Sequence, residues 1–325
     1  MRARIGFCIA ALTVAATALS APAPALASHL QCGDVVTRSV TLDSDLGPCP
    51  GDGLVAGADG IRINLNGHVI RGSGGGTGDV VDTETADGVD IDEHSGVSVE
   101  NGELANFDTG VRVWETSGAR LERLFSHNNR VGAFLYESTG NWVRFGTFRS
   151  NGYGTYVYES SSNRVVSNSM TGNTFALYAV ESSDNRIWDN AGNGSGILGF
   201  QITTESDHNS IKRNTIIGSA GVGALISVAE GNLFEDNLVR DHRIAGILVA
   251  NGPGTSLVRN TIENVSYPPE TLSPGASGIW VTNTAGAVIT RNSICGYPLP
   301  IQLTTSSDIV MTRNQMRDCS AATPR

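Results

Sequence analysis

The chain has 325 residues and a mass of 34.1 kDa, with 40% hydrophobic and 17% charged residues. This composition is typical of a chain that buries a large core, and it excludes an intrinsically disordered protein. Acidic residues outnumber basic residues by 32 to 22, which gives a formal net charge of −10. We therefore expect no nucleic-acid partner, because phosphate binding requires a basic surface.

The N-terminal segment 1–27 has the organisation of a secretory signal. Arg2 and Arg4 precede an apolar stretch over 5–19, and Ala25-Leu26-Ala27 forms a cleavage site of the A-x-A type before Ser28. We therefore expect a mature chain that starts at Ser28 and is secreted, either extracellular or periplasmic. No later apolar run is long enough to span a bilayer, so membrane insertion is not expected.

Cysteine usage predicts two disulfides. Cys8 lies in the signal segment, and the four remaining cysteines form an even set in an exported chain. The most economical pairing joins Cys32 to Cys49 and Cys295 to Cys319. Each pair closes a loop of about two dozen residues or fewer, which is worth roughly 3 kcal/mol. We expect one clamp at each end of the domain, and no C-x-x-C spacing supports a metal site at these cysteines.

A repeat of about 22 residues organises most of the chain. One asparagine column contains Asn168, Asn190, Asn214, Asn237, Asn260, Asn292 and Asn314, and a second contains Asn141, Asn163, Asn185, Asn209 and Asn232. A third column contains Gly88, Gly110, Gly132 and Gly154 and continues at Ala176. We expect the asparagines to adopt left-handed backbone angles and to hydrogen-bond to one another along each column.

The repeat predicts an all-β fold, a single-stranded right-handed parallel β-helix with about eleven coils. The apolar stretches in each unit are too short for helices, whereas 22 residues can form three short strands and three turns. A leucine-rich horseshoe has a similar period, but its leucine framework is missing. We expect an N-terminal cap over 28–60, the β-helix over 61–319 and a tail over 320–325. Two longer units, 71–87 and 264–278, are predicted to leave the rod as loops.

Alternation along the first strand of each unit separates core from surface positions. The predicted core positions are Val89, Ile91, Val111, Val113, Ala133, Leu135, Thr155, Val157, Leu177 and Ala179. The intervening positions face outward and form a predicted aromatic patch of Trp114, Phe134, Tyr136, Tyr156, Tyr158 and Tyr178. Exposed rings bind the apolar faces of sugars, so the patch is a candidate substrate-binding platform. The alternative is ordinary cross-strand packing, with the patch covered by a loop such as 71–87.

An acidic column runs beside the patch and contains Glu93, Glu115, Glu137, Glu159, Glu181 and Glu205. Stacked coils place neighbouring carboxylates about 5 Å apart, so their repulsion must be offset. One alternative is solvation together with pairing to Arg120, Arg144, Arg164 or Arg186. The others are a bound cation such as Ca²⁺, or carboxylates whose raised pKa suits acid catalysis. Because a one-coil separation is close to that of a retaining glycosidase, Glu115, Glu137 and Glu159 are candidate catalytic residues.

The start of the repeat region resembles a known group of proteins. Residues 57–60 (GADG), residues 61–70 (IRINLNGHVI) and the later N-x-I/V-x-x-N-x-I/V units look like those of secreted right-handed β-helix repeat proteins. The group includes pectate lyase-like enzymes, uronan epimerases, glycan hydrolases and NosD-type periplasmic proteins. The resemblance implies the fold, but a shared fold does not transfer a reaction.

A second cluster combines Asp90, Asp92 and Glu93 with Arg112. It is loosely similar to the pattern of the lyases, in which acids hold Ca²⁺ against a uronate and an arginine removes a proton. The three acids are therefore candidate metal ligands, and Arg112 is a candidate catalytic residue. No recognisable motif of the pectate lyases, polygalacturonases or uronan epimerases accompanies them.

These observations favour a protein that binds a polysaccharide or cell-surface glycan. If it is also an enzyme, hydrolysis is favoured over uronate lyase or epimerase chemistry. The alternative is a non-catalytic secreted structural or surface-interaction module, in which the acidic column is an arginine-paired rim. A NosD-like metal-handling role has the least support, because the His and Met residues do not cluster. The sequence leaves the oligomeric state open.

Overall fold

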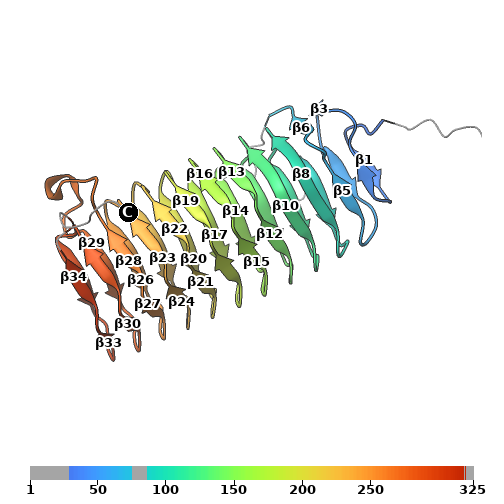
Figure 1. Cartoon of the computed structure of the whole chain (residues 1–325). Coiled ribbons are helices and arrows are strands. Elements are labelled where there is room, and N and C mark those ends of the chain that lie inside the picture. The colour runs from blue at the N-terminus through green and yellow to red at the C-terminus, as the bar shows by residue number, and fades with distance from the viewer. Residues whose placement is uncertain (1–28, 75–85, 318, 320–325) are drawn as a thin grey trace, which may run out of the picture.

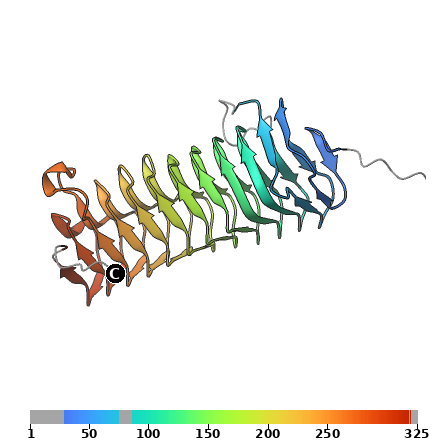
Figure 2. The ribbon, with the colours of Figure 1, turned by 45° about the horizontal axis from the view of Figure 1, so that its top comes forward.

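The computed structural model describes residues 29–74, 86–317 and 319. Within these residues the chain winds into a rod of coils stacked along one axis (Figure 1, Figure 2). The predicted signal segment, residues 75–85 of the first long loop and the predicted tail lie outside the described residues.

One face of the rod is a sheet of 12 parallel strands, here called sheet A. Its longest strands have six residues, and each strand pairs with the equivalent strand of the next coil. In spatial order they are β1 (Asp34–Val36), β4 (Leu54–Ala56), β7 (Asp87–Asp92), β9 (Thr109–Trp114), β11 (Val131–Tyr136), β14 (Tyr153–Tyr158), β17 (Phe175–Val180), β20 (Leu198–Thr203), β23 (Val222–Ser227), β26 (Ala245–Ala250), β29 (Ser277–Thr282) and β32 (Leu299–Thr304).

Shorter strands form two further faces, and the eight-residue strands β8 (Ser98–Ala105) and β10 (Arg120–His127) contribute to both. The first short-strand face also contains β2 (Val40–Thr41), β5 (Arg62–Asn64), β12 (Trp142–Arg144), β15 (Arg164–Val166), β18 (Arg186–Trp188), β21 (Ser210–Lys212), β24 (Leu233–Glu235), β27 (Ser256–Val258), β30 (Val288–Thr290) and β33 (Val310–Thr312). The second also contains β3 (Leu46–Cys49), β6 (Val69–Gly72), β13 (Thr147–Arg149), β16 (Ser169–Thr171), β19 (Ala191–Asn193), β22 (Thr215–Ile217), β25 (Leu238–Arg240), β28 (Thr261–Glu263), β31 (Ser293–Cys295) and β34 (Gln315–Arg317).

The core fills the centre of each coil, as the alternation predicted. All ten positions that the sequence assigned to the core of sheet A are buried. Large side chains such as Phe148, Phe200 and Phe234 are also fully buried. Each fully buried side chain of this kind contributes roughly 1.5–3 kcal/mol, which makes the stacked core the main source of stability.

The asparagine columns form hydrogen-bonded ladders, as predicted. In the first, the Asn168 backbone N–H donates to Asn190 Oδ1 at 3.0 Å, and the same bond repeats to the end of the column. The Asn168 Nδ2 also donates to Asn190 Oδ1 at 3.0 Å. The predicted left-handed backbone was misplaced by one residue, since it belongs to the residue before each asparagine, such as Ser167 with φ 56°. This geometry turns the chain while the asparagine side chain points inward.

A third ladder, which the sequence analysis missed, contains Asn129, Asn151 and Asn173. His242 occupies the equivalent position four coils beyond Asn151, where its Nδ1 accepts from the Ser219 N–H at 3.1 Å. The signal was present as Asn129, Asn151 and Asn173 at 22-residue spacing, but Ser195, Ser219 and His242 interrupt the run.

The glycine column marks a close approach between coils. A Cβ on Gly132 would lie 2.5 Å from the carbonyl oxygen of Gly154 on the next coil and 2.7 Å from the Phe148 ring. Because no Cβ atom tolerates contact with a carbonyl at that distance, glycine is required here by packing.

The N-terminal boundary differs from the prediction. β1 pairs with β4, and β4 pairs with β7, so coils begin at Asp34. The segment 28–60, predicted as a separate cap, therefore contributes strands to the solenoid itself. The short strands β2 and β3 concealed this, because each offers too few apolar residues to show the repeat.

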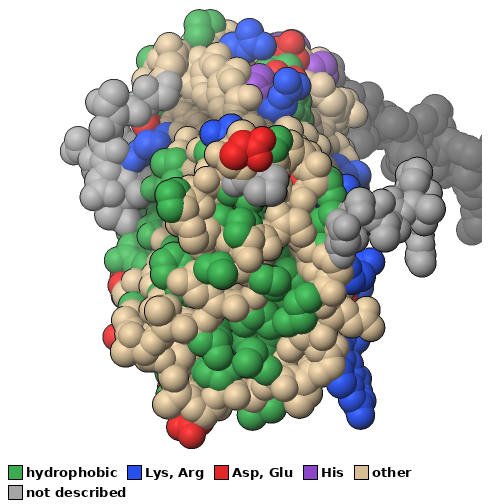
Figure 3. All heavy atoms as spheres, turned by 90° about the vertical axis from the view of Figure 1, so that its left-hand side faces the viewer, with side chains coloured by type: hydrophobic (Ala, Val, Ile, Leu, Met, Phe, Trp, Pro, Cys, Tyr) green, Lys and Arg blue, Asp and Glu red, His purple; other side chains and the backbone are tan. Residues whose placement is uncertain are grey.

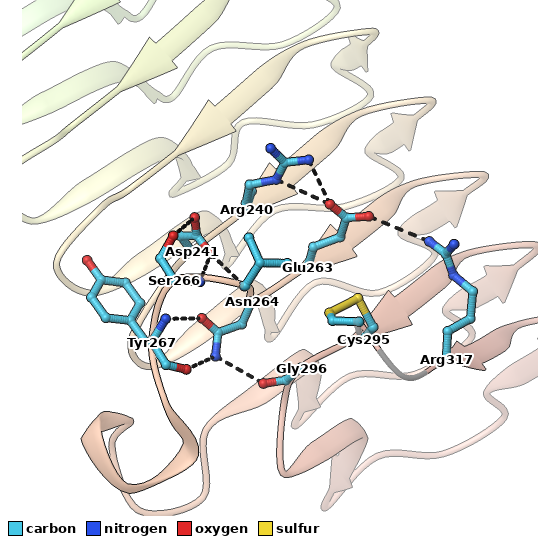
Figure 4. Close-up of a disulfide and its surroundings, with 11 residues drawn as sticks. Arg240, Asp241, Glu263, Asn264, Ser266, Tyr267, Cys295, Gly296 and Arg317 are labelled. Atoms are coloured by element: carbon cyan, nitrogen blue, oxygen red, sulfur yellow. Dashed lines mark hydrogen bonds and ion pairs between the residues drawn. A yellow bond between two sulfur atoms is a disulfide. The ribbon is translucent and has the colours of Figure 1, made fainter. Parts of the chain in front are cut away.

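Both predicted disulfides are present near the ends of the rod, Cys32–Cys49 and Cys295–Cys319. Figure 4 shows the second one beside the loop that joins β28 to β29, which includes a 3₁₀ turn η1 (Pro269–Thr271). The loop was predicted from the longer repeat. Its base is fixed by Asp241, whose Oδ1 accepts from the Val265 N–H at 2.8 Å and from the Ser266 N–H at 2.9 Å.

The last coil is open on its outer side. Leu303, Met311 and Met316 continue core columns, yet they are 39%, 48% and 54% exposed because no further described coil covers them. Figure 3 shows the resulting cluster of hydrophobic side chains on this end of the rod.

Candidate functional site

Two rows of outward side chains lie on sheet A, along the five coils from β7 to β17. We call them the middle row, which contains Asp90, Arg112, Phe134, Tyr156 and Tyr178, and the edge row, which contains Asp92, Trp114, Tyr136, Tyr158 and Val180. The pairing is in register, so the residues predicted to form one surface are brought together. Charged side chains occupy β7 and the adjacent position on β9, and aromatic ones follow.

The aromatic residues form a packed cluster. In the middle row the ring centroids of Phe134 and Tyr156 lie 5.1 Å apart, as do those of Tyr156 and Tyr178. Phe134 is 0% and Tyr156 7% exposed. The prediction that these two rings contact a ligand directly is therefore corrected, because neighbouring side chains already cover them. They support the site from below.

Two further aromatics belong to this cluster and were missed. Tyr153 stacks on Phe175 with centroids 5.1 Å apart and on Tyr156 at 5.0 Å. Both occupy the first position of their strands, in register with Val131, and pack on the outer side of the sheet. Simple alternation would turn them inward, so only the 22-residue spacing of Val131, Tyr153 and Phe175 could have revealed them.

The edge row presents its rings differently. Trp114 and Tyr136 are tilted by 45° with centroids 4.1 Å apart, and Tyr136 and Tyr158 are tilted by 50° at 5.3 Å. All three are partly buried. The stacked middle-row rings cover one another's faces, whereas tilted rings leave part of a face open. The edge row is thus where a flat apolar surface of a ligand can pack.

The acidic column lies directly after the edge row, at the turn that ends each sheet A strand. Its six members are exposed and have left-handed backbone angles, with φ between 45° and 55°. Trp114 Nε1 donates to Glu115 Oε1 at 3.0 Å, and the Tyr136 hydroxyl donates to the Glu137 carboxylate, which raises the pKa of Tyr136. Glu115 and Glu137 are therefore each joined to the preceding ring of the edge row by a hydrogen bond.

The predicted pairing of this column with arginines is not found among the described residues. Arg144 pairs with Glu122 on the first short-strand face. Arg120, Arg164 and Arg186 lie on that same face, in register with Trp142. The prediction failed because these arginines follow the turn and lie on the next face of the coil.

Arg112 is held between two carboxylates at the start of the middle row. Its Nε lies 2.9 Å from Asp87 Oδ2 and 2.9 Å from Asp90 Oδ1, and its Nη2 donates to Asp90 Oδ2 at 3.0 Å. Burial raises the pKa of Asp87 well above its usual range, with Arg112 opposing the shift. The pKa of Arg112 is itself raised, despite burial, by its hydrogen bond to Asp90 and the nearby carboxylates. This geometry suits Arg112 to positioning the acids, since a guanidinium that stays charged cannot accept a proton.

Asp92 lies at the exposed edge of this cluster, opposite Trp114. Partial burial raises the pKa of Asp92, and the negative charge of the nearby Asp90 carboxylate raises it further. Among the described residues no group of three or more His, Cys, Asp or Glu side chains is arranged to hold a metal ion. Asp90, one of the candidate calcium ligands, is engaged with Arg112 instead.

The family model for the right-handed β-helix region matches residues 87–262 and 195–323. This chain belongs to the right-handed β-helix family. Among solved structures, the periplasmic alginate epimerase AlgG is similar with a TM-score of 0.69 and 15% identity, over 87% of this chain and 74% of that one. The DFA-IIIase of Arthrobacter chlorophenolicus has a TM-score of 0.61 and 10% identity, over 77% and 69%. The Dettilon tailspike protein has a TM-score of 0.55 and 14% identity, over 82% and 62%.

Comparison with curated proteins found no match. The likeness to solved structures therefore establishes the fold, and the chemistry must be argued from the site. The two disulfides are typical of proteins outside the cytoplasm. No helix in the described part of the chain has the length and apolarity needed to cross a membrane.

Proposed function

We propose that this secreted β-helix protein binds a polysaccharide along the outer face of sheet A, over β7 to β17. The observation that carries the proposal is the edge row, where partly buried, tilted rings on successive coils each precede an exposed glutamate. Rings pack on the apolar face of a sugar, and carboxylates accept hydrogen bonds from its hydroxyl groups. A straight row of such pairs suits a linear chain of sugars.

The charge of the face indicates which polysaccharides it accepts. Arg112 is already neutralised by Asp87 and Asp90, and the adjacent acidic column adds exposed negative charge. An acidic polymer would be repelled by this surface. We therefore favour a neutral, hydroxyl-rich polysaccharide, which also suits hydrolysis better than uronate chemistry.

The site contains a pair of carboxylates that suits hydrolysis. Asp92 has a raised pKa and contributes the candidate general acid, and Glu115, held by the Trp114 indole, contributes the second carboxylate. They lie on adjacent coils, separated by about one coil spacing of 5 Å along the rod axis. Glu137 and Glu159 are equivalent candidates one and two coils further along.

Affinity electrophoresis in gels that contain a neutral glucan, xylan or mannan, with alginate and pectin as acidic comparisons, tests the binding. We expect retardation by at least one neutral polymer and its loss in Trp114→Ala/Tyr136→Ala. Phe145→Ala serves as the control, because Phe145 is an exposed aromatic on another face of the coil. Unchanged retardation in the double variant would refute the proposal.

Release of reducing ends from the retarding polymer tests catalysis separately. Asp92→Asn and Glu115→Gln should each abolish product, whereas Glu181→Gln, in the same column but beside Val180, should retain it. A wild-type protein that binds without releasing product would leave the binding proposal standing and remove the hydrolytic one. That outcome would favour the non-catalytic module. The burial of Phe134 and Tyr156, which gives both rings a structural role, is consistent with such a module.

A further inference from the structure

Beyond the sheet A face, the first short-strand face has an unusual concentration of arginine and tryptophan. Its outward positions on successive coils form what we call the arginine strip, which contains Arg120, Trp142, Arg144, Arg164, Arg186 and Trp188. The strip stands out because the whole chain carries a formal charge of −10. It lies across the turn from sheet A, so it is separate from the site described above.

Among the described residues, no ion pair neutralises the arginines in the centre of the strip. Arg164 and Arg186 lie directly opposite each other on adjacent coils, and in the described part of the chain neither pairs with an acidic side chain. Like charges directly opposite each other on neighbouring strands are destabilising, so an anion bound between them would stabilise this arrangement. By contrast, Arg144 pairs with Glu122, and Lys212 beyond the strip pairs with Glu235.

The tryptophans hold these arginines in place. The Arg164 guanidinium lies 4.5 Å from the centre of the Trp142 ring, and that of Arg186 lies 5.5 Å from the Trp188 ring. A guanidinium stacked on a ring keeps its N–H groups free at the edge, where they can donate to an oxyanion. Less side-chain entropy is then lost when an anion binds.

A hollow of about 350 Å³ lies at the two arginines. It is lined by Ser162, Arg164, Asp184, Asn185, Arg186, His208 and Ser210. Guanidinium groups bind planar carboxylates and sulfates in a bidentate manner, and the serine hydroxyls add neutral donors. Asp184 also lines the hollow, so two arginines and one aspartate leave it with a net positive charge.

We propose that the arginine strip is a second binding site, for the carboxylate or sulfate groups of an acidic polysaccharide. The strip follows the rod axis, with an arginine on each of four successive coils, so a polymer with regularly spaced anionic groups can contact several of them at once. A nucleic acid fits less well, since the strip is narrow and the chain as a whole has a formal net charge of −10. With sheet A, the rod would then contact two chemically different polymers on two faces.

The test compares dextran sulfate with dextran, polymers that differ in the sulfate group, and adds alginate for carboxylate and duplex DNA as a different anion. We expect wild type to bind dextran sulfate or alginate and not dextran through this strip, with an affinity that falls as salt rises. Arg164→Gln/Arg186→Gln should weaken binding at least tenfold and reduce the salt dependence. Arg149→Gln makes the same substitution at an exposed arginine on the second short-strand face, outside the strip. This control should have little effect on binding.

Three results would overturn the proposal. The first is that neither acidic polysaccharide binds. The second is that Arg149→Gln weakens binding as much, per arginine removed, as the double variant does. The third is that DNA binds more tightly than both polysaccharides. Urea unfolding midpoints of the variants show whether they fold, and Arg164→Lys/Arg186→Lys provides a second variant that keeps the charge. The Trp114→Ala/Tyr136→Ala variant should bind dextran sulfate normally, so failure of the sheet A proposal and failure of this one are distinguishable.

Discussion

His242 should make the stability of the rod depend on pH in a defined window. Its side chain is 0% exposed, and its Nδ1 accepts from the Ser219 N–H, so Nε2 carries the proton and donates to the Ile216 carbonyl at 3.1 Å. Burial lowers the pKa of His242 from 6.5 to about 4. The hydrogen bond to the Ile216 carbonyl and, to a lesser extent, the neighbouring Asp241 oppose this shift without cancelling it.

The direction follows from proton uptake. Between pH 6.5 and about 4 the unfolded chain binds a proton at His242 that the folded chain does not, so the free energy of unfolding falls as the pH falls. Each pKa unit is worth about 1.4 kcal/mol, so the full loss is about 3 kcal/mol below pH 4. Above pH 6.5 this contribution is fully present and constant.

The variant His242→Asn isolates the effect. Asparagine accepts the equivalent bond at Asn151 and Asn173, and it does not titrate. Above pH 7, we expect the free energies of unfolding of wild type and variant, measured in urea, to differ by a constant amount. By pH 4, this difference should have shifted by about 3 kcal/mol in favour of the variant. Carboxylates titrate in both proteins, so their contributions to the pH dependence cancel in the comparison. Parallel pH profiles would refute the reasoning.

Two further variants test the polar packing. Asn190→Ala removes the acceptor of the Asn168 N–H and the donor to the Val165 carbonyl, so it should lower the free energy of unfolding by about 3 kcal/mol, whereas Gln315→Ala at an exposed position should change it little. Equal urea midpoints would contradict the ladder's role. Arg112→Ala leaves Asp87 and Asp90 buried without their cation and should cost about 3–5 kcal/mol at pH 8. The deficit should shrink at pH 4, because protonation relieves the unpaired carboxylates; a pH-independent deficit would count against this assignment.

Much of the fold could be predicted because a constant repeat becomes a column in space. Two asparagine ladders and the core positions of sheet A follow from the spacing, and both disulfides follow from the even number of cysteines and their positions near the ends. The start of the solenoid could not be predicted, since β2 and β3 are too short to show the pattern. The repeat spacing therefore predicts which residues stack on one another, but it does not predict where the solenoid begins and ends.

The site was less predictable, because spacing indicates which residues align but not how deeply they are buried. Phe134 and Trp114 both face outward, yet packing by Tyr156 buries one while the other stays partly open. The arginines were placed beside the acidic column, although the intervening turn moves Arg164 to another face. Charge partners across a turn depend on its backbone geometry, which residue spacing alone does not provide.

Hydroxyl-radical footprinting of the protein with the neutral polysaccharide that retards it in gels tests the central claim most directly. The account predicts that Trp114 and Tyr136 are protected from oxidation, while Trp280, on sheet A four strands beyond β17, and Phe145, on another face, are not. Equal oxidation of Trp114 and Tyr136 with and without the polymer, or protection confined to Trp142 and Trp188, would contradict it.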